Sequence, residues 1–143
     1  DELARELIEA LNMQGLLAVE FFIDGNDQVQ INEVSPRPHN SGHHTIEGVI
    51  TSQFEQHLRA ILNLPLGCTR IKLPAVMLNL LGDIWNNGDP AWEAILNEPQ
   101  AHLHLYGKHE PRHGRKMGHV NCLASDADTA LGIAATLRTA LTT

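Results

Sequence analysis

Residues 16–34 read LLAVEFFIDGNDQVQINEV, and this stretch decides how the first part of the chain folds. Leu16–Ile23 is rich in branched and aromatic residues, which is typical of a β-strand. Asp24–Asp27 combines Asp, Gly and Asn, the residues that favour tight turns. Gln28–Val34 then alternates with the two-residue period of a second strand. The stretch therefore predicts a β-hairpin.

Two glutamates of this hairpin are predicted to lie on one face. A turn with an even number of residues sets Glu20 opposite Ile31 and Ala18 opposite Glu33, so the two acids become diagonal neighbours about 7–8 Å apart at the backbone. Because like charges repel, such a pair indicates a cation, and Mg²⁺ commonly binds one or two carboxylates together with substrate phosphates. Two alternatives stay open: a lysine could pair with either acid, or an odd-numbered turn could put the acids on opposite faces.

A polar loop, Ser35–Thr45, follows the second glutamate and is stiffened by two prolines. It presents a guanidinium, an imidazole, an amide and a hydroxyl within five residues: Arg37, His39, Asn40 and Ser41. These groups suit an oxyanion or a phosphate beside a metal. The alternative is an ordinary solvated connection, as most polar loops are.

A second polar loop, Lys108–Lys116, concentrates positive charge. It holds four of the chain's ten basic residues, Lys108, Arg112, Arg115 and Lys116. In a chain of net charge −7, this concentration predicts a local site for an anionic ligand. The alternative is a solvated run of charges.

The remaining pattern predicts an α+β fold in two parts, residues 1–69 and residues 70–143. In the first part, apolar spacing predicts a helix within residues 1–14. A second helix starts at Ser52, with Glu55 completing a capping box. Its predicted buried stripe consists of Phe54, Leu58, Ile61 and Leu62.

The second part is predicted to hold three strands and two helices. The strands are Ala75–Leu81, Ala101–Tyr106 and Met117–Ala124. One helix ends near Asn97, and the other is capped by Ser125 together with Asp128.

Composition excludes several classes of protein. The chain has 143 residues, of which 43% are hydrophobic, too many for a disordered tail, and no apolar run reaches the ~18 residues of a membrane span. The acidic balance and 4% aromatic content argue against nucleic-acid binding. Cys68 and Cys122 lack CxxC spacing, which favours a reducing, cytoplasmic setting. Asp1 opens directly on a helical pattern, so we interpret the chain as a piece of a longer protein.

Several motifs resemble a known family. LAVEFFI (17–23) and INEVSPR (31–37) look like the metal-binding end of ATP-grasp ligases. The longer run NEVSPRPHNSGH (32–43), with TSQFEQHLRA (51–60) and GRKMGH (114–119), resembles the N5-carboxyaminoimidazole ribonucleotide synthases of purine biosynthesis. The resemblance covers essentially the whole chain. It implies the C-terminal half of an ATP-grasp domain followed by a small mixed α/β C-terminal domain.

The activity implied by the resemblance is a ligase reaction. ATP phosphorylates bicarbonate to carboxyphosphate, and 5-aminoimidazole ribonucleotide then captures the activated carbon. ATP and Mg²⁺ are the implied cofactors, the partners are small molecules, and the full-length enzyme is implied to be a homodimer. Glu20 and Glu33 would hold Mg²⁺, and Asn32 would lie in the nucleotide site. Many ATP-grasp enzymes have Asn where this chain has Ser35, so a third side-chain ligand is in doubt.

The resemblance also implies substrate contacts. Arg37 would grip bicarbonate or the transferring phosphoryl group, and His39 and Asn40 would face the aminoimidazole and bicarbonate. Arg37 and His39 are therefore the implied catalytic residues. Lys108 and Arg115 would hold the phosphate of the ribonucleotide.

Three alternatives stay open beside this interpretation. The formate-dependent glycinamide ribonucleotide transformylases share the Ser-Pro-Arg-Pro-His run but resemble the chain less at residues 40–43. A non-catalytic module that binds nucleotide or metal could keep the fold. A purely structural interaction domain would leave Glu20 unexplained.

Overall fold

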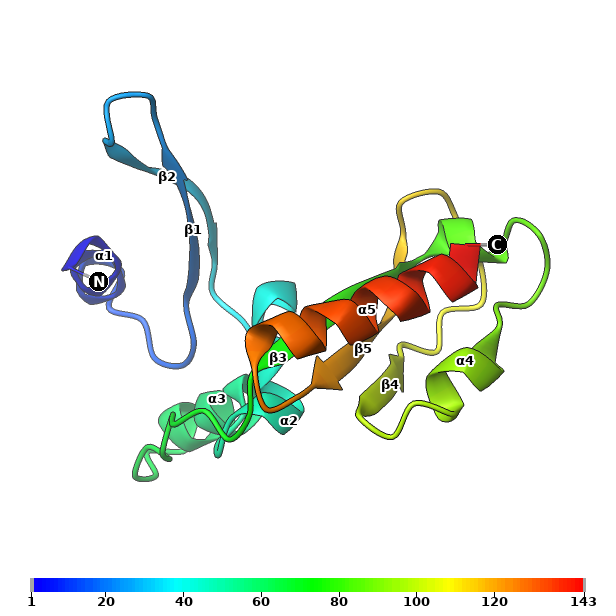
Figure 1. The fold of residues 1–143 in the computed structure, drawn as a ribbon. Helices are drawn as coiled ribbons and strands as arrows, with labels where there is room; N and C mark the ends of the chain where they lie inside the picture. The colour runs from blue at the N-terminus through cyan, green and yellow to red at the C-terminus, as the bar shows by residue number, and fades with distance from the viewer. Residues whose placement is uncertain (1, 143) are drawn as a thin grey trace. The chain divides into compact units, whose positions relative to one another are not determined.

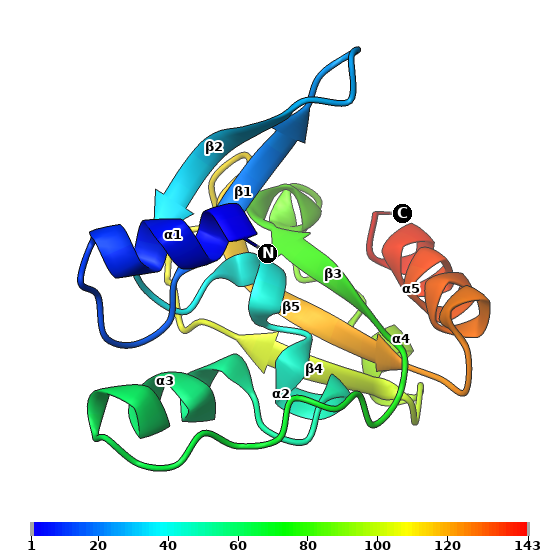
Figure 2. The same cartoon turned by 90° about the vertical axis from the view of Figure 1, so that its left-hand side faces the viewer.

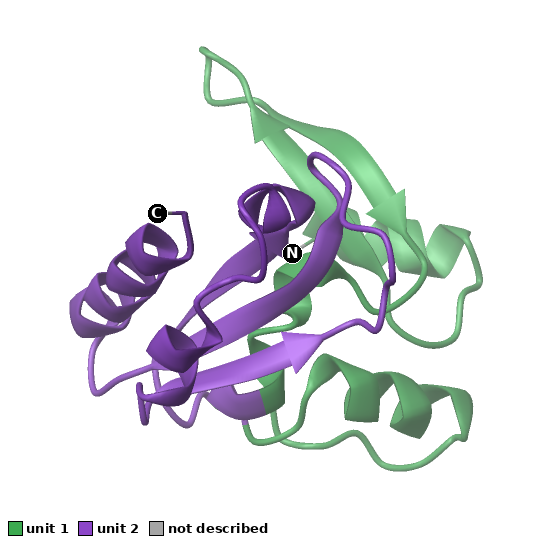
Figure 3. Cartoon of the chain, turned by 90° about the vertical axis from the view of Figure 1, so that its right-hand side faces the viewer, with its two compact units in different colours: residues 1–46, 50–70 green, residues 47–49, 71–143 purple. Residues whose placement is uncertain are grey.

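The computed structural model describes residues 2–142, and the chain divides into two compact units. Unit 1 comprises residues 1–46 and 50–70, and unit 2 comprises residues 47–49 and 71–143 (Figure 3). Asp1, on which the interpretation of the chain as a piece rests, lies outside the described residues. No helix within residues 2–142 has both the length and the apolar character needed to cross a membrane.

Unit 1 is built around the predicted hairpin, which is confirmed. Its elements, shown in Figure 1, are α1 (Glu2–Ala10), β1 (Ala18–Ile23), β2 (Val29–Ser35), η1 (Asn40–Gly42), the start of α2 (Thr45–Gly48) and α3 (Gln53–Ile61). β1 and β2 pair antiparallel as a two-stranded sheet. The predicted helices within 1–14 and after Ser52 are confirmed as α1 and α3.

The turn of the hairpin differs from the prediction. The Asp24 N–H donates to the Gln28 carbonyl at 3.0 Å, which leaves three residues, 25–27, in the loop. Asp27 has a φ of 57°, the left-handed conformation that ends many three-residue hairpin loops. An odd loop pairs Ile23 with Val29, so the predicted register is wrong by one residue near the turn.

A β-bulge adds a second one-residue shift before the two acids and so restores their common face. Phe21 pairs with Ile31, but Glu20 pairs with Glu33, so Asn32 is an extra residue on β2. Without the bulge, the odd loop would set Glu20 opposite Asn32 and turn Glu33 to the other face. With it, Glu20 and Glu33 are direct cross-strand partners and share a face. The predicted common face is confirmed, although the diagonal register that led to it is wrong.

Helix α3 begins as predicted but does not bury its apolar face. The Ser52 hydroxyl oxygen accepts the Glu55 N–H at 3.3 Å, while the Glu55 carboxylate pairs with Arg59 at 2.7 Å. The prediction of a buried stripe is wrong, because its four side chains are between 39% and 63% exposed: Phe54, Leu58, Ile61 and Leu62. Periodicity identified the apolar face, but the described residues supply no layer that covers it.

Unit 2 is a three-stranded antiparallel sheet with helices packed on it. Its elements are β3 (Ala75–Leu81), η2 (Gly82–Trp85), α4 (Trp92–Leu96), β4 (Ala101–Leu105), β5 (Lys116–Leu123) and α5 (Ala127–Thr142). The strand order is β3-β5-β4, so the three predicted strands are confirmed and β5 is central. α5 packs against β3 and β5, and α4 packs against β4 and α5 (Figures 1 and 2).

The core of unit 2 lies between the sheet and the helices α4 and α5. It consists of Leu80, Ile95, Val120, Cys122, Ala134, Leu137 and Leu141. The predicted cap of α5 is wrong by one residue: an Asp126 carboxylate oxygen accepts the Thr129 N–H at 2.7 Å, and the Ser125 hydroxyl donates to Asp126. Aspartate is the stronger cap here because its charge also favours the positive end of the helix dipole.

Alternate residues of β5 form a buried polar cluster instead of apolar core. His119 and Asn121 are 2% and 0% exposed. Asn121 donates to the Glu47 carboxylate at 2.6 Å, and the same carboxylate lies 2.8 Å from the His104 Nε2. The rings of His104 and His119 stack with centroids 4.5 Å apart. The cluster ties residues 47–49 to the sheet of unit 2.

Candidate functional site

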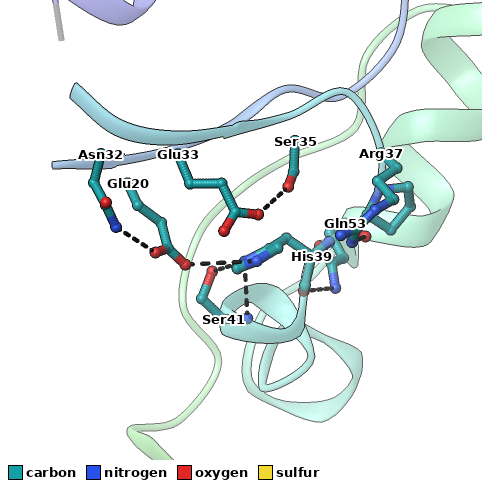
Figure 4. A network of polar contacts seen from close by, with 9 residues as sticks. Glu20, Asn32, Glu33, Ser35, Arg37, His39, Ser41 and Gln53 are labelled. Carbon is teal, nitrogen blue, oxygen red and sulfur yellow. Dashed lines mark hydrogen bonds and ion pairs between the residues drawn. The ribbon is translucent and has the colours of Figure 1, made fainter.

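The two hairpin acids are held in place by two side chains of β2. Glu33 accepts a hydrogen bond from the Ser35 hydroxyl at 2.9 Å, and Ser35 is only 5% exposed. Glu20 accepts a bond from the Asn32 amide at 3.4 Å. Both carboxylates extend from the hairpin toward His39 (Figure 4). The bulge thus places Asn32 beside the acid pair as well as aligning the pair.

His39 presents one ring nitrogen to this pair. Its Nε2 lies 3.5 Å from a Glu20 carboxylate oxygen, and its Nδ1 accepts the Ser41 N–H at 3.4 Å. Because Nδ1 is an acceptor, we assign the proton of the neutral ring to Nε2, the nitrogen that faces Glu20. His39 can therefore act as a hydrogen-bond donor at the acid pair while uncharged. No lysine pairs with either acid within the described residues.

Gln53, which the site prediction missed, holds His39 in position. Its side-chain oxygen accepts the His39 N–H at 2.9 Å, and its amide nitrogen donates to the His39 carbonyl at 2.8 Å. The same nitrogen lies 2.8 Å from Nδ1 of His43. A Cβ at Gly42 would lie 2.5 Å from the Gln53 side-chain oxygen, so a larger residue there would displace the Gln53 side chain from His39. The sequence carries no local signal for this contact, because Gln53 and His39 lie 14 residues apart.

Arg37 and Asn40, the other predicted residues of the polar loop, flank His39 in the sequence. The Arg37 guanidinium donates to the Pro38 carbonyl at 3.1 Å. Asn40 begins η1, for which His39 is the N-terminal cap. The structure therefore brings Glu20, Glu33 and His39 together with Asn32, and sets Arg37 and Asn40 on either side of His39 in the chain.

The basic loop forms the connection between β4 and β5 in unit 2. The Lys108 ammonium donates to the Lys116 carbonyl at 2.6 Å and lies 5.4 Å from the centre of the Tyr106 ring. The Arg115 guanidinium donates to the Glu110 carbonyl at 2.9 Å. The side chain of Arg112 pairs with the Glu110 carboxylate, so this arginine is partly neutralised.

The donor set at the acid pair fits one kind of metal. Among residues 2–142, no three or more His, Cys, Asp or Glu side chains converge as a metal site. Two opposed carboxylates do not satisfy zinc, which takes three or four protein ligands. They do suit Mg²⁺, because it completes its octahedral shell with water and phosphate oxygens.

Two family profiles match separate parts of the chain. Residues 1–54 match the ATP-grasp domain, and residues 75–132 match the phosphoribosylaminoimidazole carboxylase C-terminal domain. Among curated relatives, the chain is 46% identical over 127 residues to the N5-carboxyaminoimidazole ribonucleotide synthase of Bacillus subtilis. It is 43% identical over 129 residues to the enzyme of that name from Staphylococcus aureus. Each match covers 89% of the chain and 33% of the relative, so the chain spans about a third of their length.

Solved structures give the same result. The crystal structure of N5-carboxyaminoimidazole ribonucleotide synthetase from Thermotoga maritima matches with a TM-score of 0.85 and 46% identity, covering 97% of this chain and 39% of that one. The synthase from Aspergillus clavatus, in complex with ADP and 5-aminoimidazole ribonucleotide, matches with a TM-score of 0.84 and 39% identity. That match covers 98% of this chain and 38% of the Aspergillus chain.

Proposed function

We propose that this chain, which belongs to the family of N5-carboxyaminoimidazole ribonucleotide synthases, carries the metal-binding and substrate-binding groups of an ATP-dependent carboxylation. The product would be N5-carboxyaminoimidazole ribonucleotide, formed from 5-aminoimidazole ribonucleotide, bicarbonate and ATP. The observation that carries the proposal is the direct pairing of Glu20 with Glu33, with the His39 Nε2 beside it. The relatives reported above bear the name of the synthase and not that of the transformylase.

The acid pair would bind the metal and the nucleotide. Glu20 and Glu33 would hold Mg²⁺, which supplies charge neutralisation for the phosphates of ATP when bound. Ser35 keeps Glu33 turned toward the site through its 2.9 Å hydrogen bond and need not be a ligand itself. Asn32 would contribute to the nucleotide site from its position beside Glu20.

The two polar loops would bind the other reactants. Arg37 would stabilise the charge that develops on bicarbonate and the transferred phosphoryl group. His39 and Asn40 would face bicarbonate and the aminoimidazole, with the Nε2–H of His39 as a donor. Lys108 and Arg115 would bind the phosphate of the ribonucleotide as fixed positive charges.

The arrangement of the family implies two further features. We propose that residues 1–69 belong to the ATP-grasp domain and residues 70–143 to the small C-terminal domain; the profile matches over 1–54 and 75–132 support this division. A homodimer and a cytoplasmic setting remain predictions. The two free cysteines are in keeping with a reducing environment.

The metal site can be tested on the chain itself. Mn²⁺, a paramagnetic substitute for Mg²⁺, should broaden the NMR signals of residues close to the acid pair, and added Mg²⁺ should restore them. Glu33→Gln keeps the shape of the side chain but removes its charge, so the broadening should disappear. Glu9→Gln, on α1, is the matched control and should leave it unchanged. Broadening that persists in Glu33→Gln would contradict the site.

The reaction requires a longer chain. We therefore suggest a chimera in which residues 1–143 replace the matching third of the Bacillus subtilis relative. The chimera should release ADP only when 5-aminoimidazole ribonucleotide and bicarbonate are present, and Glu33→Gln in the chimera should abolish this release. A folded chimera that turns over normally with Glu33→Gln would refute the assignment.

A further inference from the structure

Residues 107–115, which include all of the basic loop except Lys116, lie outside the strands, although the charges of this loop need fixed positions to bind a ligand selectively. Its side chains are open to solvent, with Arg112 72% and His113 96% exposed. Side-chain burial therefore contributes little to the order of this loop, which depends on hydrogen bonds and close backbone contact with residues 82 and 83.

Asp83, at the start of η2, supplies two of these bonds. One carboxylate oxygen accepts the Gly114 N–H at 2.8 Å, and the other is hydrogen-bonded to Nδ1 of His113. The Gly114 N–H, together with His113, holds the pKa of Asp83 below its ordinary value. Asp83 is thus ionised at neutral pH, and both of its oxygens are occupied by the loop.

Gly82 supplies a third bond and a close approach. Its N–H donates to the Arg115 carbonyl at 2.8 Å. A Cβ at Gly82 would lie 2.2 Å from the Arg112 carbonyl oxygen and 2.5 Å from the Arg112 nitrogen. Both atoms belong to the backbone, so the loop would have to move if any side chain were present at this position.

These contacts converge on Arg115. Its N–H donates to the Arg112 carbonyl at 2.9 Å, its carbonyl accepts from Gly82, and the next residue's carbonyl binds the Lys108 ammonium. The backbone on both sides of the guanidinium is therefore fixed. A cation held in this way loses little conformational entropy when it binds an anion.

We infer that Gly82 and Asp83 form a clamp of positioning residues that holds Lys108 and Arg115 ready for a phosphate monoester. This inference rests on the proposed function, which gives these two cations the phosphate of the ribonucleotide. An aspartate beside an anion-binding loop would otherwise oppose binding by repulsion. Here the Asp83 carboxylate is hydrogen-bonded to the Gly114 N–H and to His113. Through these bonds it orders the loop that carries the cations.

The test uses the 143-residue chain, amide hydrogen exchange and ribose 5-phosphate as the probe. Asp83→Ala should speed the exchange of the Gly114 and Arg115 amides by about tenfold, since it removes a charged acceptor. It should weaken ribose 5-phosphate binding by a similar factor. The exchange of central β5 amides and the melting temperature should stay as they are, which a merely structural role would not allow.

Three further variants sharpen the result. Asp83→Asn keeps an oxygen that can accept the Gly114 N–H, so it should restore part of the binding. Gly82→Ala should displace the loop, whereas Gly132→Ala, where a Cβ meets nothing within 4 Å, is the matched control. Loop amides and binding that match those of the parent chain in both Asp83→Ala and Gly82→Ala would overturn the clamp. If the parent chain fails to bind ribose 5-phosphate although Asp83→Ala loosens the loop, the phosphate role itself is refuted.

Discussion

Replacing Gln53 with alanine tests how the polar loop of unit 1 is held. Gln53 is 5% exposed and binds both backbone groups of His39, at 2.9 and 2.8 Å. The substitution should therefore release His39 from its position beside Glu20 without touching either acid.

The magnitude follows from the bonds that are lost. A hydrogen bond contributes a net ~0.5–1.5 kcal/mol, and a shielded backbone group left without a partner costs about 1–3 kcal/mol. Gln53→Ala removes two bonds to His39 and the contact with His43. We expect the free energy of unfolding of unit 1 to fall by about 2–4 kcal/mol.

The assay has to report on unit 1. Both tryptophans, Trp85 and Trp92, belong to unit 2, so their fluorescence would miss the effect. Native-state exchange of the His39 amide measures it directly. Gln56→Ala is the matched control on the same helix, because Gln56 binds Gly67 through two comparable bonds of 2.9 and 2.8 Å. An unchanged His39 exchange rate in Gln53→Ala, or an equal change in Gln56→Ala, would refute the reasoning.

Three more predictions can be checked with standard measurements. At pH 8 a thiol reagent should modify Cys68 quickly and Cys122 only on unfolding, because a backbone hydrogen bond lowers the pKa of Cys68 and burial raises that of Cys122 to about 11. Asp126→Asn should lower the melting temperature at pH 7 but not in strong acid. In the fold, the backbone N–H of Thr129 lowers the pKa of Asp126. The stabilisation by Asp126 is therefore full above its ordinary pKa of 3.8 and is lost as the pH falls through the lowered value. Ser35→Ala should weaken Mn²⁺ binding several-fold while leaving Glu33 in place, and unaltered binding would show that the 2.9 Å bond does not orient Glu33.

Local patterns in the sequence were sufficient for most elements of the fold. The hairpin, the strands of unit 2 and the helices α1, α3, α4 and α5 were predicted from features that act over a few residues: alternation, turn residues and capping residues. Helix α2 (Thr45–Gly48) was not predicted. Even the error at α5 is small, because Ser125 and Asp126 are both good caps and only the geometry of the helix start chooses between them.

The burial of α3 could not be predicted, for a different reason. The spacing of Phe54, Leu58 and Ile61 identifies an apolar face correctly. Whether that face is covered depends on the elements available to pack against it, and these are not encoded in the helix itself. The role of Gln53 was not predicted for the same reason: its partner His39 lies 14 residues away, and no local sequence rule links the two.

The acid pair shows why a correct common face can follow from a wrong register. Side chains of a strand alternate between faces, so each one-residue shift exchanges the faces. The odd loop at residues 25–27 makes one such shift, and the bulge at Asn32 makes a second, which returns Glu33 to the face of Glu20. Neither shift is visible in the alternation of apolar and polar residues, yet together they bring the two acids directly opposite one another instead of diagonally. Because a bulge leaves its extra residue outside the ladder, the Asn32 side chain is also free to reach Glu20, so one inserted residue both aligns the carboxylates and adds a third polar group to them.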